Sequence, residues 1–248
     1  MLTASADDHE LAATLARQAG QLLVELRRSG LEGDELKNRG DRLSDDLLVP
    51  ALRKARPEDG LLSEESIDDP SRLERRRVWI VDPLDGTREY GEKGRWDWAV
   101  HVGLAIDGHA VAGAVALPER DLVLSTAAPS TLPPPTDPPR VVVSRSRPPR
   151  LAVQVAEILG AELVELGSAG AKTMAVVLGD ADIYLHAGGQ YEWDNCAPAA
   201  VAAAAGLHTS RIDGSPLRYN NADPSLPDLL VCRAELADAT LAAIRRCA

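Results

Sequence analysis

The chain has 248 residues, of which 45% are hydrophobic, 26% are charged and only 3% are aromatic, with no phenylalanine. This is an ordinary composition for a globular protein with one large domain or two modest ones, and its core must be mainly aliphatic. The net charge of −11 and the pI of about 4.9 argue against nucleic-acid polymers and anionic membranes as partners, since both require a basic face. A small anionic substrate is compatible with this charge if metal ions or a few local cations receive it.

The remaining bulk features concern location. Cys196, Cys232 and Cys247 have neither metal-ligand spacing nor the density of a disulfide framework, which indicates reduced thiols. The N-terminal MLTASADDHE lacks the basic and apolar regions of a signal peptide. No apolar run approaches the ~20 residues that span a bilayer. We therefore expect a cytoplasmic protein that does not associate with membranes.

The N-terminal half, residues 1–128, is predicted to be an α+β unit. Leucines that recur every third or fourth residue predict helices over residues 8–29 and 42–55. Apolar runs predict strands at 78–81, 98–106, 110–117 and 122–125. Turns at Asp107-Gly108 and Pro118-Glu119 join the last strands into an antiparallel meander.

The clearest boundary is the segment 129–139, PSTLPPPTDPP, in which six of the eleven residues are proline. Such a segment excludes helix and regular sheet and favours an extended linker. After it, strands and helices alternate, which predicts a layered α/β unit over residues 140–248. The predicted strands are 140–143, 162–166, 183–186 and 229–232, and the predicted helices are 151–159, 171–178, 196–205 and 234–245.

The stretch VWIVDPLDGT, residues 78–87, carries the strongest chemical signal. A buried strand runs directly into Asp82 and Asp85, and proteins with α/β layers commonly bind ligands at the carboxyl ends of strands. Two converging carboxylates repel each other unless a cation lies between them. Hard divalent cations prefer carboxylate and carbonyl oxygens. The motif therefore suggests Mg²⁺, with the Leu84 carbonyl as an additional ligand and Gly86 allowing close approach of the backbone.

The same composition is also common in turns and helix caps, and on this motif alone the two interpretations are evenly balanced. Two other stretches favour the metal. Glu64 and Glu65 follow a short apolar step in SEES, and Asp194 opens an apolar helix in YEWDNCAPAA. Each alone is typical of a solvated acidic pair or an N-cap. Together they offer one more acid from each of two separate elements.

These motifs resemble the signature of the inositol monophosphatase superfamily of lithium-sensitive, Mg²⁺-dependent phosphatases. The matching parts are Asp41 in RGDRLS, Glu64-Glu65, DPLDGT at 82–87 and WDNCA at 193–197. They stand in the family's order, and the resemblance covers nearly the whole chain. The closest branch resembles the CysQ-type 3′(2′),5′-bisphosphate nucleotidases, which have Gly-Thr-Lys-Glu-Phe where this chain has Gly-Thr-Arg-Glu-Tyr.

The resemblance implies a five-layered αβαβα sandwich of the inositol monophosphatase and fructose-1,6-bisphosphatase type, with the active site between the halves. It also implies two or three Mg²⁺ ions. The implied metal ligands are Glu64, Asp82, the Leu84 carbonyl, Asp85 and Asp194, with Asp82 bridging two ions. The implied catalytic residues are Asp41, Thr87, Glu64 and Asp85, of which Asp41 and Thr87 orient the attacking water.

The resemblance further implies a cationic substrate pocket in the second half. The implied substrate-binding residues are Gly86, Thr87, Arg147, Ser168, Lys172, His186 and Asp194. The chain departs from the family here: Arg147 stands where histidine is usual, Ala169 falls where a serine is expected beside Ser168, and His186 replaces an arginine of some relatives. From the residues alone, His186 fits a structural role as well as a ligand role, Lys172 can also be a solvated helix lysine, and His101 is expected to be structural.

The function that the resemblance implies is hydrolysis of the 3′-phosphate of 3′-phosphoadenosine 5′-phosphate to AMP, a step that clears a by-product of sulfate assimilation. One alternative is a broad phosphatase acting on inositol-1-phosphate or fructose-1,6-bisphosphate. Another is a non-catalytic metal- or nucleotide-binding protein, against which the complete acid set with Asp41 and Thr87 argues. We expect a small phosphorylated substrate as the partner, and the sequence leaves homodimerisation open.

Overall fold

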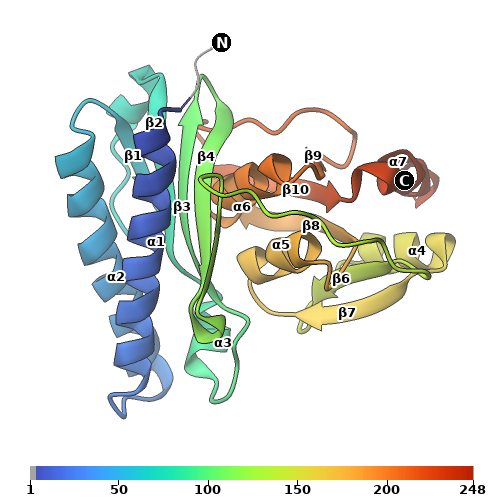
Figure 1. The fold of residues 1–248 in the computed structure, drawn as a ribbon, viewed down its shortest axis with the longest axis horizontal. Helices are drawn as coiled ribbons and strands as arrows, with labels where there is room; N and C mark the ends of the chain where they lie inside the picture. The colour runs from blue at the N-terminus through green and yellow to red at the C-terminus, as the bar shows by residue number, and fades with distance from the viewer. Residues whose placement is uncertain (1–3, 248) are drawn as a thin grey trace.

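The computed structural model describes residues 4–247 and contains two five-stranded β-sheets. Helices cover the outer faces of both sheets and fill the space between them, so that the layers run helix, sheet, helix, sheet, helix (Figure 1). The five-layered αβαβα arrangement implied by the resemblance is thereby confirmed. The expectation of no signal peptide concerns in part residues 1–3, which lie outside the described residues. Across residues 4–247, none of the helices combines the length and apolar character that crossing a bilayer requires.

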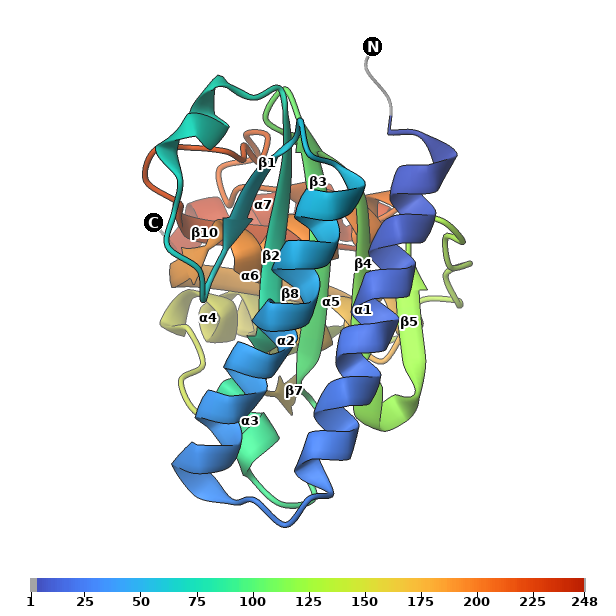
Figure 2. The same cartoon turned by 90° about the vertical axis from the view of Figure 1, so that its left-hand side faces the viewer.

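The first sheet has the strand order β1-β2-β3-β4-β5. Its strands are β1 (Gly60–Ser63), β2 (Arg77–Asp85), β3 (Ala99–Ile106), β4 (His109–Leu117) and β5 (Leu122–Ser125). Strand β1 is parallel to β2, and β2 to β5 form the predicted antiparallel meander. The helices α1 (Ala6–Arg27) and α2 (Gly33–Ala55) run side by side over the outer face of this sheet (Figure 2). The short helix α3 (Thr87–Gly91) follows β2 directly.

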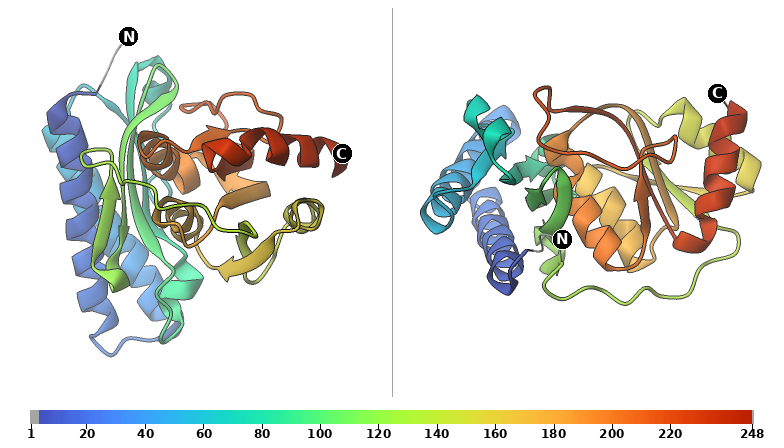
Figure 3. Two further views of the ribbon diagram at one scale, coloured as in Figure 1. Left: turned by 45° about the vertical axis from the view of Figure 1, so that its right-hand side comes forward. Right: turned by 90° about the horizontal axis from the view of Figure 1, so that it is seen from above.

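The second sheet has the order β7-β6-β8-β10-β9. Its strands are β6 (Arg140–Ser144), β7 (Glu162–Leu166), β8 (Ile183–Tyr191), β9 (His208–Ser210) and β10 (Ser225–Cys232). Its helices are α4 (Arg150–Leu159), α5 (Ala169–Leu178), α6 (Glu192–Ala204) and α7 (Ala237–Cys247). Helices α4 and α7 pack on the outer face, and α5 and α6 form the middle layer between the two sheets (Figures 1 and 3).

The proline-rich segment 129–139 contains no helix or strand and runs along the outside of the molecule from β5 to β6 (Figure 3). The apolar core is nevertheless continuous across it. One buried cluster contains Ile80 and Val115 of the first sheet together with Met174 of α5 and Val201 of α6. The two halves therefore share an interior, and the linker joins units that are packed against each other.

Several elements begin earlier than the residue patterns predicted. Helix α2 begins at Gly33 rather than near residue 42, because the polar turn of Asp34 and Glu35 leads into the buried Leu36. Helix α6 begins at Glu192 rather than at residue 196, so that Asp194 lies inside its first turn. Two further differences concern the C-terminal part. The predicted last helix is split into a 3₁₀ turn at Ala234–Leu236 and helix α7. The edge strand β9 was not predicted, since it is only three residues long.

Two glycines decide how closely α6 approaches the first sheet. Gly103 of β3 and Gly113 of β4 are directly opposite in the register of these strands. A Cβ on Gly103 would lie 2.9 Å from the Ala197 nitrogen, and one on Gly113 would lie 3.0 Å from the Ala197 Cα. Real Cβ atoms essentially never come within 2.9 Å of backbone, and a contact of 3.0 Å is tighter than nearly all of those observed. The absence of two side chains thus lets α6, and Asp194 with it, lie against the centre of the sheet.

We predict that Gly113→Ala lowers the free energy of unfolding by about 1–3 kcal/mol, because the added methyl group must push α6 away from the sheet. Urea denaturation followed by circular dichroism measures this. A control is Ala110→Ser at a half-buried position of the same strand, which should change stability much less. Equal stability of Gly113→Ala and the wild type would contradict this account of the packing.

Candidate active site

Strand β2 ends in a β-bulge that sets the direction of its two aspartates. Asp82 pairs with His101 and Asp85 pairs with Ala99, so that a step of three residues on β2 faces a step of two on β3. In a regular strand, residues three apart point to opposite faces of the sheet. The extra residue of a bulge alters this alternation. Both carboxylates can therefore reach the same side of the sheet.

The buried backbone of the bulge is held by side chains. The Asp82 carboxylate accepts a hydrogen bond of 3.0 Å from the Leu84 nitrogen. The Ser44 hydroxyl of α2 donates one of 2.7 Å to the Pro83 carbonyl. Buried backbone groups need such partners, so these contacts stabilise an otherwise irregular strand end.

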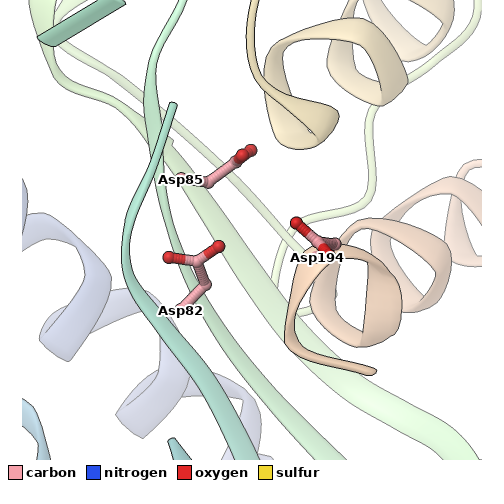
Figure 4. Close-up of side chains that lie close together, drawn as sticks. All are labelled: Asp82, Asp85 and Asp194. Carbon is pink, nitrogen blue, oxygen red and sulfur yellow. The ribbon is translucent and has the colours of Figure 1, made fainter. Parts of the chain in front are cut away.

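Three carboxylates converge at this end of β2. Asp82 and Asp85 come from the bulge and Asp194 comes from the first turn of α6, and an oxygen of each lies within 4.8 Å of the others (Figure 4). Asp82 and Asp85 are only 1% and 6% exposed. Burial and repulsion from Glu64 hold the pKa of Asp82 well above its usual range, and burial and repulsion from Asp85 raise that of Asp194 to about 6. An all-oxygen, buried anionic set fits a hard divalent cation.

Asp85 connects the two halves of the protein. Its Oδ1 accepts a hydrogen bond of 3.1 Å from the Ala169 nitrogen and its Oδ2 one of 2.6 Å from the Gly170 nitrogen, both at the start of α5. His101 Nε2 lies 3.2 Å from the same Oδ2. Burial raises the pKa of Asp85, but the adjacent His101 and the Gly170 N–H outweigh it, and the net shift is downward. Among the three carboxylates, Asp85 is therefore the one that its neighbours hold in the ionised form.

Asp194 is positioned by its own helix. It is the third residue of α6, and its Oδ2 accepts a hydrogen bond of 2.6 Å from the Tyr191 nitrogen. The side chain thus caps the helix without being the N-cap residue, and its other oxygen is left for the cluster. The cap and the metal-ligand interpretations of Asp194 are compatible.

Glu64 lies beside the three aspartates but is not one of the group within 4.8 Å. It follows the end of β1, where its nitrogen donates to the Val81 carbonyl at 3.4 Å, and its carboxyl group is within hydrogen-bonding reach of Asp82. Desolvation and repulsion from Asp194 raise the pKa of Glu64 to about 7. Asp45 of α2 holds this segment by accepting hydrogen bonds from Ser63 and Ser66, at 2.6 and 2.7 Å.

Asp41 and Thr87 meet at the same end of the sheet. The Thr87 hydroxyl lies 3.3 Å from Asp41 Oδ1 and 3.1 Å from the Leu84 carbonyl. Burial and repulsion from Glu65 raise the pKa of Asp41 to about 6. The predicted water-orienting pair and the predicted carbonyl ligand are therefore linked through one hydroxyl group.

The two halves are in close contact at Gly86. This residue has φ +85°, and a Cβ here would lie 2.8 Å from the Ser168 Cβ. Only glycine combines that backbone conformation with that proximity. The Ser168 hydroxyl accepts a 2.9 Å hydrogen bond from the Ala171 nitrogen and so caps α5. A cap explains Ser168 without a substrate.

A cavity of about 410 Å³ lies next to the cluster, on the side of the second sheet. Its lining contains four of the predicted substrate-binding residues, namely Arg147, Lys172, His186 and Asp194. Gly86, Thr87 and Ser168 are not part of that lining. The structure therefore gathers the predicted cations around one space and leaves the other three at the junction of the halves.

The cations of this cavity differ in how far they are already engaged. Lys172 is buried, its ammonium group donates to the Gly167 carbonyl and, at 2.8 Å, to the Ser168 carbonyl, and burial lowers its pKa. His186 Nε2 lies 2.7 Å from the Gly188 carbonyl. Arg147 is exposed. Lys172 is thus not the solvated helix lysine of the alternative interpretation.

Sequence reasoning missed three residues that hold the site together. The Arg145 guanidinium bonds to Glu89 at 2.8 Å and to Glu92 at 2.6 Å, and Asp97 accepts the Gly167 N–H; these contacts join the two halves. His101 was expected to be only structural. Burial lowers its pKa, but the Asp85 carboxylate outweighs burial and the net shift is upward. A lone histidine in an apolar strand was the available signal. The sequence does not show which residues this histidine contacts, because its neighbours depend on the register between β2 and β3.

The comparisons with known proteins agree with this geometry. The family model described as "Inositol monophosphatase family" matches residues 7–130 and 140–248. The chain belongs to the inositol monophosphatase family. A relative from Mycobacterium leprae, named 3′-phosphoadenosine 5′-phosphate phosphatase, is 49% identical over 96% of this chain and 93% of its own length. The "3′(2′),5′-bisphosphate nucleotidase CysQ" of Escherichia coli O157:H7 is 30% identical over 83% of this chain and 91% of its own length.

A solved structure has the same fold. The crystal structure of CysQ from Bacteroides thetaiotaomicron superposes with a TM-score of 0.80 at 24% identity and covers 92% of this chain and 97% of that one. This likeness concerns the fold. The resemblance to the inositol monophosphatase family and to its CysQ-type branch is thus confirmed. Metal dependence of the family is consistent with the acidic cluster.

We predict that Asp194→Asn stabilises the metal-free protein at pH 8 by about 1–2 kcal/mol, a value reduced for solvent screening. The folded-state pKa of about 6 lies above the ordinary 3.8. Protonated Asp194 therefore favours the folded state, and that stabilisation is present below pH ~4 and lost as the pH rises through ~6. Asparagine imitates the protonated form and keeps an acceptor for the Tyr191 N–H.

Urea denaturation in EDTA at pH 4 and pH 8 measures this effect. The exposed Asp46→Asn of α2 is the control for the loss of one charge. If Asp194→Asn were no more stable than the wild type at pH 8, the three carboxylates would not repel each other as described.

Proposed function

We propose that this protein is a Mg²⁺-dependent phosphatase that removes the 3′-phosphate from 3′-phosphoadenosine 5′-phosphate and releases AMP. The observation that carries the proposal is the position of the three-carboxylate cluster beside a cavity lined by Arg147, Lys172 and His186. The carboxylate cluster, once it holds metal ions, suits the phosphate that reacts. The cavity with its cations suits a second anionic group of the substrate. The name of the 49% identical relative supports this substrate. The reaction would serve sulfate assimilation in the cytoplasm.

Asp82, Asp85 and Asp194 would hold the Mg²⁺ ions, with Glu64 and the Leu84 carbonyl at the edge of the group. When bound, such ions neutralise phosphate charge and activate water for in-line displacement. They also explain how a chain of net charge −11 accepts an anionic substrate. A Mg²⁺ site demands oxygen ligands in a buried anionic setting, which the cluster provides.

The chain's own residues would position the water and the phosphate. Asp41, with a pKa of about 6, is poised to accept a proton near neutral pH, and the Thr87 hydroxyl would orient the same water. The Gly86-Thr87 backbone, open because Gly86 has a positive φ, would receive the phosphate. The cavity would hold the 5′-phosphate, with Arg147 as its exposed cation.

A second candidate is a broader phosphatase acting on inositol-1-phosphate or fructose-1,6-bisphosphate. One observation favours it: the Lys172 ammonium group already donates to two carbonyls, which leaves less free positive charge for a second phosphate. The non-catalytic alternative is set aside, because the curated relatives across most of the chain carry phosphatase names.

We predict that kcat/KM with Mg²⁺ is at least about tenfold higher for 3′-phosphoadenosine 5′-phosphate than for 3′-AMP, inositol-1-phosphate or fructose-1,6-bisphosphate, since a lost charge-assisted contact costs about 1.4 kcal/mol or more. Phosphate release over this panel measures it. Arg147→Ala should raise KM for the bisphosphate and leave that for 3′-AMP nearly unchanged. Equal kcat/KM values across the panel would favour the broader phosphatase.

We predict that Asp85→Asn lowers kcat by at least about a hundredfold while the protein stays folded, because the amide binds a hard cation poorly. Phosphate release and circular dichroism test the two parts. Exposed Asp46→Asn is the matched control. Millimolar lithium should inhibit the wild type. Full activity of Asp85→Asn would contradict the assignment of the cluster as the catalytic metal site.

A further inference from the structure

His101 lies inside the candidate site without belonging to the implied ligand or substrate set. It is fully buried in the middle of β3, directly opposite Asp82 of β2. A buried imidazole among three carboxylates differs from the otherwise apolar pattern of β3, whose other residues are Ala, Val, Gly, Leu and Ile. Its surroundings therefore call for a physical explanation.

The His101 ring contacts both elements that supply the aspartates, namely the end of β2 and the first turn of α6. His101 Nε2 lies 3.2 Å from Asp85 Oδ2, at the bulge of β2. Its Nδ1 lies 3.0 Å from the carbonyl oxygen of Trp193, the residue that precedes Asp194 in α6. The Nδ1 contact is a hydrogen bond, whereas the Nε2 contact is a close approach of the ring to the carboxylate without hydrogen-bond alignment. One side chain thus spans from the first sheet to the helix of the middle layer.

The ring is also enclosed, which fixes its orientation. A Cβ on Gly170, at the start of α5, would overlap His101 Nε2 and would lie 3.1 Å from Asp85 Oδ2. The same glycine donates its N–H to Asp85. Glycine at position 170 therefore leaves room for the imidazole beside the carboxylate, and α5 closes the space over it.

We propose that His101 is a positioning residue that holds Asp85 and the first turn of α6, and with it Asp194, at the separation a divalent cation requires. Without a cation, two buried carboxylates and the half-buried Asp194 push one another apart. A rigid ring that contacts Asp85 through Nε2 and is hydrogen-bonded to the Trp193 carbonyl through Nδ1 opposes that separation and keeps the site preformed. The inference rests on the metal requirement of the proposed function, but it does not depend on which phosphate ester is the substrate.

Substitutions that imitate one end of the ring separate this role from simple packing. The amide nitrogen of glutamine lies near the position of Nε2 and can reach Asp85. The amide of asparagine lies near the position of Nδ1 and can reach only the Trp193 carbonyl. Alanine removes both contacts, and leucine fills a similar volume without making either. A half-buried histidine outside the site, His208 of β9, provides the control variant His208→Gln.

The experiment is isothermal titration calorimetry with Mn²⁺ on the metal-free full chain, without substrate. We expect His101→Ala to weaken Mn²⁺ binding about 10- to 100-fold, as loss of a hydrogen-bonding partner of a metal ligand commonly does. His101→Gln should recover most of the affinity and His101→Asn less. The Mg²⁺ concentration for half-maximal activity should rise in the same order, while KM for the bisphosphate at saturating Mg²⁺ changes less than about threefold.

Urea denaturation of each variant provides the second measurement. Wild-type Mn²⁺ affinity in a folded His101→Ala or His101→Asn would overturn the proposal. So would a folded His101→Leu that binds Mn²⁺ as tightly as His101→Gln, because such a result indicates space filling alone. Tight Mn²⁺ binding by a wild type that is inactive on the bisphosphate would contradict the proposed function and leave the role of His101 standing.

Discussion

The repulsion between three carboxylates, two of them buried and the third half-buried, is the constraint on which the rest of the structure depends. Asp82, Asp85 and Asp194 are brought together by a β-bulge and by the close packing of α6 on a pair of glycines. A fold does not bury such a group without compensation, because a buried charge must be paired, protonated or bound to a cation. The raised pKa of Asp82 and Asp194 shows the cost, and the lowered pKa of Asp85 shows the compensation that its neighbours provide.

The site is also a junction, because its residues come from both sheets and from the helices between them. Asp85 accepts hydrogen bonds from the start of α5, and Arg145 joins the loop after β6 to Glu89 of α3 and to Glu92, which follows that helix. The continuous apolar core holds the two sheets in a fixed relation. The acids and the cationic cavity are thereby held at a fixed distance from each other.

Apolar periodicity and the proline-rich linker are local features, and they predicted most of the elements and the two halves, whereas the five layers were implied by the family resemblance. The sequence also placed Asp82 and Asp85 at a strand end. It did not predict the bulge that turns both to one side, because bulges depend on pairing between strands. The same reason hid His101, whose partners lie on β2 and α6. Ser168 and Lys172 resemble pocket residues in sequence, yet their polar groups bond to backbone at the start of α5, which the sequence does not show. Their substrate roles stay predictions.

The measurement that tests this account most directly is a crystal structure of the protein soaked in Mn²⁺, with anomalous diffraction data collected to locate the ion. The account predicts an anomalous peak bound by oxygens of Asp82, Asp85 and Asp194, with Asp85 still accepting the Gly170 N–H and His101 still bridging to the Trp193 carbonyl. A map without a peak at these carboxylates at saturating Mn²⁺, with ions bound elsewhere on the acidic surface, would contradict it.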